Sequence, residues 1–529
     1  MPLKHTEIVT MHQKEDGWVR TLEISPPDLQ NNTADADRLI DTLKSRLDIR
    51  RLDLTIDLEL LRQLPFLMRE WGYRVRCILL KDRAHWVLTG LLPVDDKRSP
   101  AGVAIDLGTS RVVLRLVDLT SGNVLAEDAF DNPQIEIGPD ILTRIHYADD
   151  HKGLERLQQL ICDGINQHLA QLCRSCSRVP TDIYLITVAG NTTMTHLLLG
   201  LSPSRMIREP YIPVVNRPGL IPSAELGLQA SPHARVFVFP NIGSYFGGDL
   251  IAGILYAGVH RSDNTALLVD VGTNAEVVLG NKQWLIACAG AAGPALESSV
   301  TRMGMMAGPG VIDRVRFERT IGEFDLHTIA DRPPCGICGS GLIDLAAELF
   351  LSGMIDMRGR FRPQTCSDRL IDVGGIPNLV IVPADLSATG KPLTISQVDL
   401  DSLIRSKAAM YTILETITAT VGIGLKDIAT FFVAGTFGTF IQPASAIGIG
   451  MLPDLPLQTY KVLGNTSLGG AALLLTSNRL MEEIDQIRNR ITYLELNINQ
   501  DFMNRFSAAR FLPHTDRARF PSVRPLASG

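Results

Sequence analysis

From residue 17 to about residue 92, short apolar strand-like runs alternate with longer helical patterns. Short runs with the residue pattern of β-structure predict strands at residues 19–24, 52–56 and 73–80. Apolar residues at three-to-four spacing predict helices at residues 34–47 and 58–71, the second with a kink at Pro65. Together these elements predict a small N-terminal α/β domain.

A polar stretch that contains two prolines, residues 93–100, separates this domain from the rest of the chain, so we place its limits at residues 1–99. Beyond it, apolar strands and helical patterns alternate to about residue 480. The spacing predicts a long helix at residues 397–421, a shorter one at 482–490 and a strand at 492–498. This larger region is therefore also expected to have an α/β fold.

One pattern returns within the larger region. The sequence Asp106-Leu-Gly-Thr-Ser110 lies between two apolar runs. A similar sequence, Asp270-Val-Gly-Thr-Asn274, also lies between two apolar runs. The repetition predicts two similar half-domains, which we place at residues 100–262 and 263–529.

The first repeated segment is expected to form a β-hairpin with a polar tip. Gly108 lets the backbone N–H groups turn outward, while Thr109 and Ser110 add hydroxyl donors. Asp106 is a candidate ligand for a hydrated Mg²⁺ ion. A single segment of this kind is more often an ordinary turn, because Asp and Gly are common turn residues.

The second copy changes that assessment. It supplies Asp270, Gly272, Thr273 and Asn274 in the same order between two apolar runs. The pair of hairpins favours a nucleotide site in which both hold the β- and γ-phosphates of ATP. In this interpretation Asp106 and Asp270 act catalytically and share the Mg²⁺ ion.

A third segment, Phe-Phe-Val-Ala-Gly-Thr-Phe-Gly-Thr-Phe at residues 431–440, places Gly435, Thr436 and Gly438 after an apolar strand. Glycine at the end of a buried strand lets the backbone approach a flat purine closely. Alone this segment is also compatible with a structural turn, but its position after both hairpins favours adenosine binding. Neither a Gly-x-x-x-x-Gly-Lys-Ser/Thr loop nor a well-placed Gly-x-Gly-x-x-Gly occurs in the sequence.

Asp249 lies in a glycine-rich segment, residues 241–253, just before the second hairpin. Two interpretations are open for it. It is either a catalytic residue that orients the attacking water or the metal, or the cap of a helix over residues 250–256. Small residues here and at 338–348 would let helices cross closely as a nucleotide cleft opens and closes.

Composition narrows the class of protein. The 57 acidic against 51 basic residues give a formal charge of −6, without the basic field that nucleic-acid binding needs. The N-terminus does not have the pattern of a signal peptide, and no apolar stretch is long enough to span a membrane. We therefore expect a cytoplasmic protein that binds neither nucleic acid nor membrane.

Eight cysteines are present, and they are expected to be reduced thiols. Two Cys-x-x-Cys pairs, Cys173/Cys176 and Cys335/Cys338, offer soft ligands for zinc or an iron–sulfur cluster. The alternative, buried small apolar residues, is favoured for both pairs.

The order of two phosphate hairpins and an adenosine segment resembles the ATP-binding superfamily of actin, heat-shock chaperones and sugar kinases, which has two ribonuclease-H-like half-domains. From about residue 20 to 525 the chain also resembles the reductive activators of corrinoid proteins, a family with an actin-like ATPase domain. The segments that carry this resemblance are residues 132–134 (Asn-Pro-Gln), 138–144, 189–200, 209–213, 290–297, 336–341 and 463–465.

This resemblance implies an ATP-hydrolysing activator that converts the Co(II) form of a corrinoid methyl-carrier protein to Co(I), and it suggests a homodimer. Members of the family usually carry an iron–sulfur cluster in a ferredoxin-like domain at one end. Here no cysteine precedes Cys77 and none follows Cys366. We therefore expect no iron–sulfur cluster in this chain and a separate ferredoxin-like electron donor.

Two other functions are compatible with the same motifs. The first is a small-molecule kinase of the superfamily, in which Asp249 is the base for a substrate hydroxyl. The second is a non-catalytic module that binds nucleotide to hold a closed shape, with the N-terminal domain as its docking surface.

Overall fold

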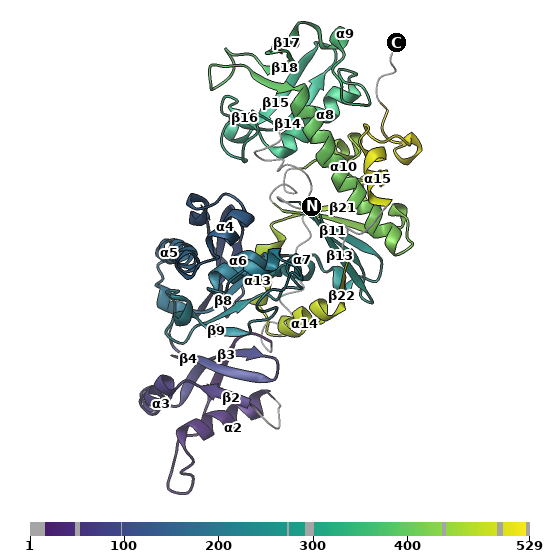
Figure 1. The fold of residues 1–529 in the computed structure, drawn as a ribbon. Coiled ribbons are helices and arrows are strands. Elements are labelled where there is room, and N and C mark those ends of the chain that lie inside the picture. Colours follow the sequence, from purple (N-terminus) through teal and green to yellow (C-terminus); the bar gives the residue numbers. More distant parts are fainter. Residues whose placement is uncertain are drawn as a thin grey trace. The chain divides into compact units, whose positions relative to one another are not determined.

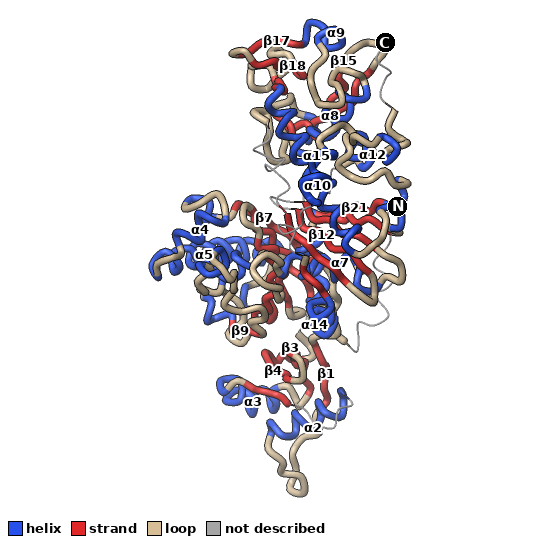
Figure 2. The backbone as a smooth tube through the Cα atoms, turned by 45° about the vertical axis from the view of Figure 1, so that its right-hand side comes forward, coloured by secondary structure: helices blue, strands red, loops and turns tan. Residues whose placement is uncertain are grey.

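The computed structural model describes residues 16–47, 53–96, 98–271, 275–290, 301–435, 441–494 and 501–524. Contacts divide the chain into two compact units, each of mixed α/β structure (Figures 1 and 2). The first unit comprises Met1–Tyr256 and Thr466–Arg490, and the second comprises Ala257–Asn465 and Ile491–Gly529. The predicted division into residues 1–99, 100–262 and 263–529 stays a prediction.

The N-terminal part of the first unit is a four-stranded sheet with two helices. The strand order is β1-β3-β4-β2. The elements are β1 (Val19–Glu23), α2 (Asp35–Leu47), β2 (Asp53–Ile56), α3 (Leu58–Glu70), β3 (Arg74–Asp82) and β4 (His85–Pro93). Apolar residues of both helices, such as Leu39 and Leu64, are buried together with Cys77 of the sheet.

All five elements predicted for this part are present, and α3 continues through Pro65. The sequence pattern did not predict β4. Its residues form one apolar run without alternation, because both faces of this central strand are covered, and it follows β3 after only two residues.

A six-stranded sheet forms the centre of the first unit. Its order is β7-β6-β5-β8-β10-β9. The strands are β5 (Ala101–Leu107), β6 (Arg111–Asp118), β7 (Val124–Asp131), β8 (Ile183–Gly190), β9 (Leu220–Pro222) and β10 (Arg235–Val238). The helices of this part are α4 (Ile141–Tyr147), α5 (His151–Ser175), α6 (Thr192–Leu198), α7 (Gly248–Ala257), α13 (Thr466–Leu474) and α14 (Leu480–Arg490).

The second unit contains a six-stranded sheet in which five strands have the same order and directions as β7-β6-β5-β8-β10. Its order is β21-β20-β11-β12-β13-β22. The strands are β11 (Ala266–Val271), β12 (Ala275–Gly280), β13 (Leu285–Gly290), β20 (Thr430–Ala434), β21 (Tyr460–Gly464) and β22 (Ile491–Tyr493). In both sheets the hairpin strand that precedes the Asp-x-Gly-Thr tip lies between an antiparallel and a parallel neighbour. The internal repeat of the sequence therefore corresponds to a repeat of sheet topology.

Two three-stranded sheets and five helices complete the described part of the second unit. The strands are β14 (Val311–Glu318), β15 (Glu323–Thr328), β16 (Gly336–Ile337), β17 (Leu370–Val373), β18 (Ile376–Val382) and β19 (Leu393–Ser396). The helices are α8 (Gly339–Leu351), α9 (Pro363–Cys366), α10 (Gln397–Thr420), α12 (Pro443–Gly448) and α15 (Asp501–Ala509). Helix α10 matches the long helix predicted at residues 397–421 and lies beside α15 (Figure 1).

The predictions for the C-terminal part were less accurate. The helix predicted at residues 482–490 begins earlier, at Leu480. The strand predicted at 492–498 is present only as Ile491–Tyr493, and residues 495–500 lie outside the described residues. Among the described residues, no helix is both long and apolar enough to cross a membrane. The eight cysteines are free thiols.

Helices α7 and α13 cross at very short distance within the first unit. A Cβ atom on Gly470 of α13 would overlap the carbonyl oxygen of Ala252 in α7. At the preceding position, a Cβ atom on Gly469 would lie 2.6 Å from the Tyr256 ring. The crossing therefore requires glycine on α13, and it fixes the first turn of this helix beside the central sheet.

We predict that Gly470→Ala destabilises the first unit by about 2–3 kcal/mol, because forcing a methyl group into a filled contact outweighs the better helix propensity of alanine. The midpoint of urea unfolding measures the change. Gly448→Ala is the control, since its Cβ atom would make only an ordinary contact, 3.6 Å from the Cβ of Ala347. Equal stability of the Gly470 variant and the wild type would contradict the close crossing.

Candidate functional site

The first Asp-x-Gly-Thr segment forms the predicted hairpin, with β5 and β6 paired in antiparallel register up to Leu107 and Val112. Gly108 cannot be replaced without strain, because a Cβ atom there would overlap the carbonyl oxygen of Arg111. Asn132 holds the tip: its side-chain Nδ2 donates to the Gly108 carbonyl at 2.9 Å, and its backbone N–H donates to the Ser110 carbonyl at 2.8 Å. The tip is thus held in one conformation.

Asp106 ends the buried part of β5 and meets the first turn of α13. The hydroxyl of Ser467 donates to Asp106 Oδ1 at 2.7 Å. Asp106 and Thr109 are partly exposed, and Ser110 is exposed. The carboxylate and the hydroxyl groups at the tip are therefore accessible to a ligand.

Asp249 lies close enough to Asp106 for the two carboxylates to influence each other. It is in the first turn of α7, where its Oδ1 accepts the backbone N–H of Leu250 at 2.9 Å. Its side chain stays partly exposed, but the protein around it excludes much of the water. This burial raises the pKa of Asp249 to about 7; the Leu250 N–H lowers the pKa, and the charge of Asp106 raises it.

The loop before α7 packs directly against the end of β8. A Cβ atom on Gly247 would lie 2.5 Å from Asp249 Oδ1 and 2.6 Å from the Cα of Asn191. Similarly, a Cβ atom on Gly190 would lie 2.8 Å from the carbonyl oxygen of Leu107 in β5. Two glycines therefore let the hairpin, the β8 turn and the Asp249 loop come together.

Sequence reasoning missed three polar residues that belong to this cluster: Asn132, Asn191 and Ser467. A signal for one of them was present, since Val188-Ala-Gly190, which precedes Asn191, matches Val433-Ala-Gly435 of the predicted adenosine segment. No comparable signal marks Ser467, which lies 361 residues from Asp106 in the chain.

The second unit repeats the arrangement. Strands β11 and β20 are parallel, with Asp270 opposite Ala434. Gly435 has a positive φ of 89°, and a Cβ atom there would lie 2.7 Å from Asp270 Oδ1 and 2.8 Å from the Val271 carbonyl oxygen. The first glycine of the predicted adenosine segment thus packs against the Asp of the second hairpin.

The remaining predicted residues, Gly272, Thr273, Asn274, Thr436 and Gly438, lie outside the described residues. That Asp106 and Asp270 share one Mg²⁺ ion stays a prediction.

The first hairpin suits a magnesium nucleotide. Mg²⁺ is usually held by one or two carboxylates and by phosphate oxygens and water, which Asp106 with Asp249 beside it fits. Gly108 lies against the Arg111 carbonyl within the hairpin, and Gly190 lies against the Leu107 carbonyl of β5, so neither position has room for a Cβ atom. In the described residues, no group of three or more His, Cys, Asp or Glu side chains is placed to hold a metal by itself.

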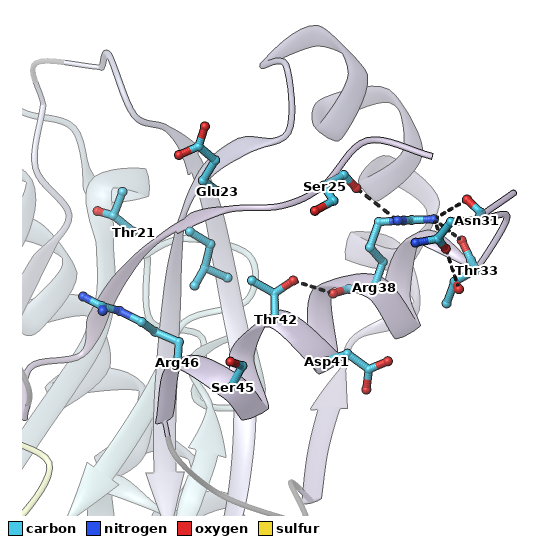
Figure 3. A pocket seen from close by; sticks show the side chains of 11 residues that line it. Thr21, Glu23, Ser25, Asn31, Thr33, Arg38, Asp41, Thr42, Ser45 and Arg46 are labelled. Atoms are coloured by element: carbon cyan, nitrogen blue, oxygen red, sulfur yellow. Dashed lines mark hydrogen bonds between the residues drawn. The ribbon is translucent and has the colours of Figure 1, made fainter. Parts of the chain in front are cut away.

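A separate pocket of about 690 Å³ lies between β1 and α2 in the N-terminal part (Figure 3). The Arg38 guanidinium at its edge donates to the Ser25 carbonyl at 3.1 Å and to the Asn31 carbonyl at 2.8 Å. These bonds fix the loop between β1 and α2, so Arg38 has a structural role. The pocket contains no predicted site residue.

Comparison with protein-family models matches three consecutive parts of the chain. Residues 17–98 match the RACo linker region, residues 101–262 the RACo middle region, and residues 264–524 the C-terminal domain of RACo, the ASKHA domain. A solved structure, "Reductive activator for corrinoid,iron-sulfur protein", is 36% identical with a TM-score of 0.86, covering 96% of this chain and 81% of that chain. The chain belongs to the RACo family.

Two characterised relatives agree with this assignment. The "Corrinoid activation enzyme RamQ" of Eubacterium limosum is 31% identical over 439 residues, which cover 80% of this chain and 73% of that protein. The "[Co(II) methylated amine-specific corrinoid protein] reductase" of Methanosarcina barkeri is 25% identical over 441 residues, which cover 76% of this chain and 75% of that protein. Membership of the RACo family confirms the predicted actin-like α/β fold and the family resemblance of the sequence.

We predict that Asp249→Asn makes the metal-free protein more stable at pH 8, by about 3 °C or more in the midpoint of thermal unfolding. Folding raises the pKa of Asp249 to about 7. Below its unfolded pKa the carboxyl group is protonated in both states and does not lower the stability of the fold. As the pH rises from that value through about 7 the unfolded chain loses the proton more easily than the folded protein, so the folded state is destabilised. The difference between variant and wild type should therefore vanish near pH 4. An equal difference at both pH values would contradict the raised pKa.

Proposed function

We propose that this protein is an ATP-hydrolysing activator that drives a corrinoid protein from Co(II) to Co(I). The observation that carries the proposal is the cluster of Asp106, Asp249 and the glycine-shaped hairpin tip in a chain of the RACo family. The names of the relatives, a corrinoid activation enzyme and a Co(II) corrinoid protein reductase, support it.

In this proposal the hairpin tip binds the phosphates of ATP. Thr109 and Ser110 donate from their hydroxyl groups, and Asp106, held by Ser467, is a ligand of Mg²⁺. Bound Mg²⁺ neutralises charge on the phosphate oxygens. The proposal also includes the second unit. Asp270 shares the Mg²⁺ ion there, and nucleotide binding involves Gly435 together with the predicted residues Gly272, Thr273, Asn274, Thr436 and Gly438.

Asp249 is the candidate general base. A water molecule attacks the γ-phosphorus and passes a proton to the Asp249 carboxylate, the bond between the γ-phosphorus and the bridging oxygen breaks, and ADP and phosphate leave. A carboxylate with a pKa of about 7 accepts a proton more readily than an ordinary one. Its position next to Asp106 places it at the same hairpin.

The reduction of Co(II) to Co(I) requires one electron. We propose that a separate ferredoxin-like iron–sulfur protein supplies it. ATP hydrolysis then drives the conformational step that makes the transfer favourable. A homodimer and a location in the cytoplasm belong to this proposal as well.

The test combines the protein with a Co(II) corrinoid protein of a methyltransferase system, a reduced ferredoxin and Mg²⁺-ATP. We predict that the Co(I) absorption band appears with ATP and not with a β,γ-imido analogue. Asp106→Asn and Asp249→Asn should each lower both ATP hydrolysis and Co(I) formation by about 100-fold or more.

Asp263→Asn serves as the matched control, since Asp263 is an exposed carboxylate that forms a surface ion pair with Lys282. It should retain the wild-type rates. Transfer of phosphate from ATP to a small metabolite, without any effect on the corrinoid protein, would instead identify a kinase and refute the proposal.

A further inference from the structure

Asn191 is the point at which three parts of the first unit meet. Its side-chain Nδ2 donates to Thr109 Oγ1 on the phosphate hairpin at 3.1 Å. Its Oδ1 accepts the Met194 N–H at 2.9 Å and so caps α6. Its Cα lies against Gly247, the glycine that also contacts Asp249. One residue therefore joins the hairpin, a helix and the loop of the candidate base.

The hydrogen bonds fix the orientation of the Asn191 amide. The Met194 N–H is a donor, so the side-chain atom facing it must be the oxygen, and the NH₂ group then faces Thr109. An amide NH₂ only donates. Thr109 Oγ1 must therefore accept this bond with a lone pair, and its own O–H is left to donate in another direction.

We propose that Asn191 is a positioning residue that directs the Thr109 hydroxyl proton toward the phosphates of bound ATP. The inference rests on the proposed function, because it needs ATP phosphates at the hairpin tip. In this proposal the Val188-Ala-Gly190 turn of the first unit takes part in nucleotide binding. The turn ends the strand that runs parallel to the hairpin strand, and the predicted adenosine segment has the same position in the second unit. Asn191 acts through Thr109 and not by contact with the reacting atoms.

Two substitutions separate this role from helix capping. Both Asn191→Ser and Asn191→Asp keep a good N-cap residue, so α6 should remain folded, which circular dichroism and urea unfolding verify. Serine is too short to reach Thr109, and aspartate presents an acceptor where the amide donates. We expect each variant to bind the β,γ-imido analogue of ATP about tenfold more weakly, since hydrogen bonds to charged groups are stronger than those between neutral groups and orientation accounts for part of this strength.

Affinity for AMP should stay unchanged in both variants, because AMP lacks the β- and γ-phosphates. Titration calorimetry with Mg²⁺ measures both ligands. Asp140→Asn is the matched control: it exchanges carboxylate for amide at another helix N-cap, where the side chain accepts the Thr143 N–H at 2.9 Å, and should bind both ligands like the wild type.

A double-mutant cycle tests whether Asn191 acts through Thr109. In a Thr109→Val background the hydroxyl is gone, so adding Asn191→Ser should cause no further loss of affinity. An equal loss in both backgrounds, a parallel loss for AMP, or an unaffected Asn191→Ser variant would overturn the role of Asn191. Absence of analogue binding by the wild type would instead overturn the proposed function.

Discussion

The candidate site depends on backbone contacts so close that they exclude a Cβ atom. Gly190 lies against the Leu107 carbonyl of the first hairpin, and Gly435 lies against the Val271 carbonyl of the second. In each sheet this contact joins a hairpin strand to its parallel neighbour just beyond the Asp. Any larger residue would push the two strand ends apart. The backbone therefore positions the polar groups of the site, and the surrounding side chains pack around this backbone.

Much of the fold could be predicted from the sequence because its elements are local. Helix α10 and the first hairpin follow from apolar periodicity and from turn residues within a few positions of each other. Strand β4 was missed for a physical reason, since a strand covered on both faces shows no alternation. The similarity of the two halves was predicted from a repeated sequence motif, and it corresponds to the strand order that the two six-stranded sheets share.

The site was predicted less completely, because its contacts join distant segments. Asp106 was identified from its motif, whereas its partner Ser467 comes from a helix that no local pattern connects to the hairpin. Asp249 illustrates the same limit. The residues alone left a catalytic and a capping interpretation open, since its pKa depends on burial and on the nearby Asp106, which are tertiary properties. Asn191 lies within residues 189–200, a segment that carries the family resemblance, and the Val188-Ala-Gly190 before it matches Val433-Ala-Gly435.

Packing and electrostatics at this site are linked as cause and effect. Two carboxylates near each other, one of them largely desolvated, cost stability, so the surrounding structure must hold them in place. The crossing of α7 and α13 does this, because Gly470 against Ala252 fixes the helix that carries Ser467 and the helix that carries Asp249 at the same time. The absence of a side chain at residue 470 thus lets the two helices that carry Ser467 and Asp249 pack directly against each other.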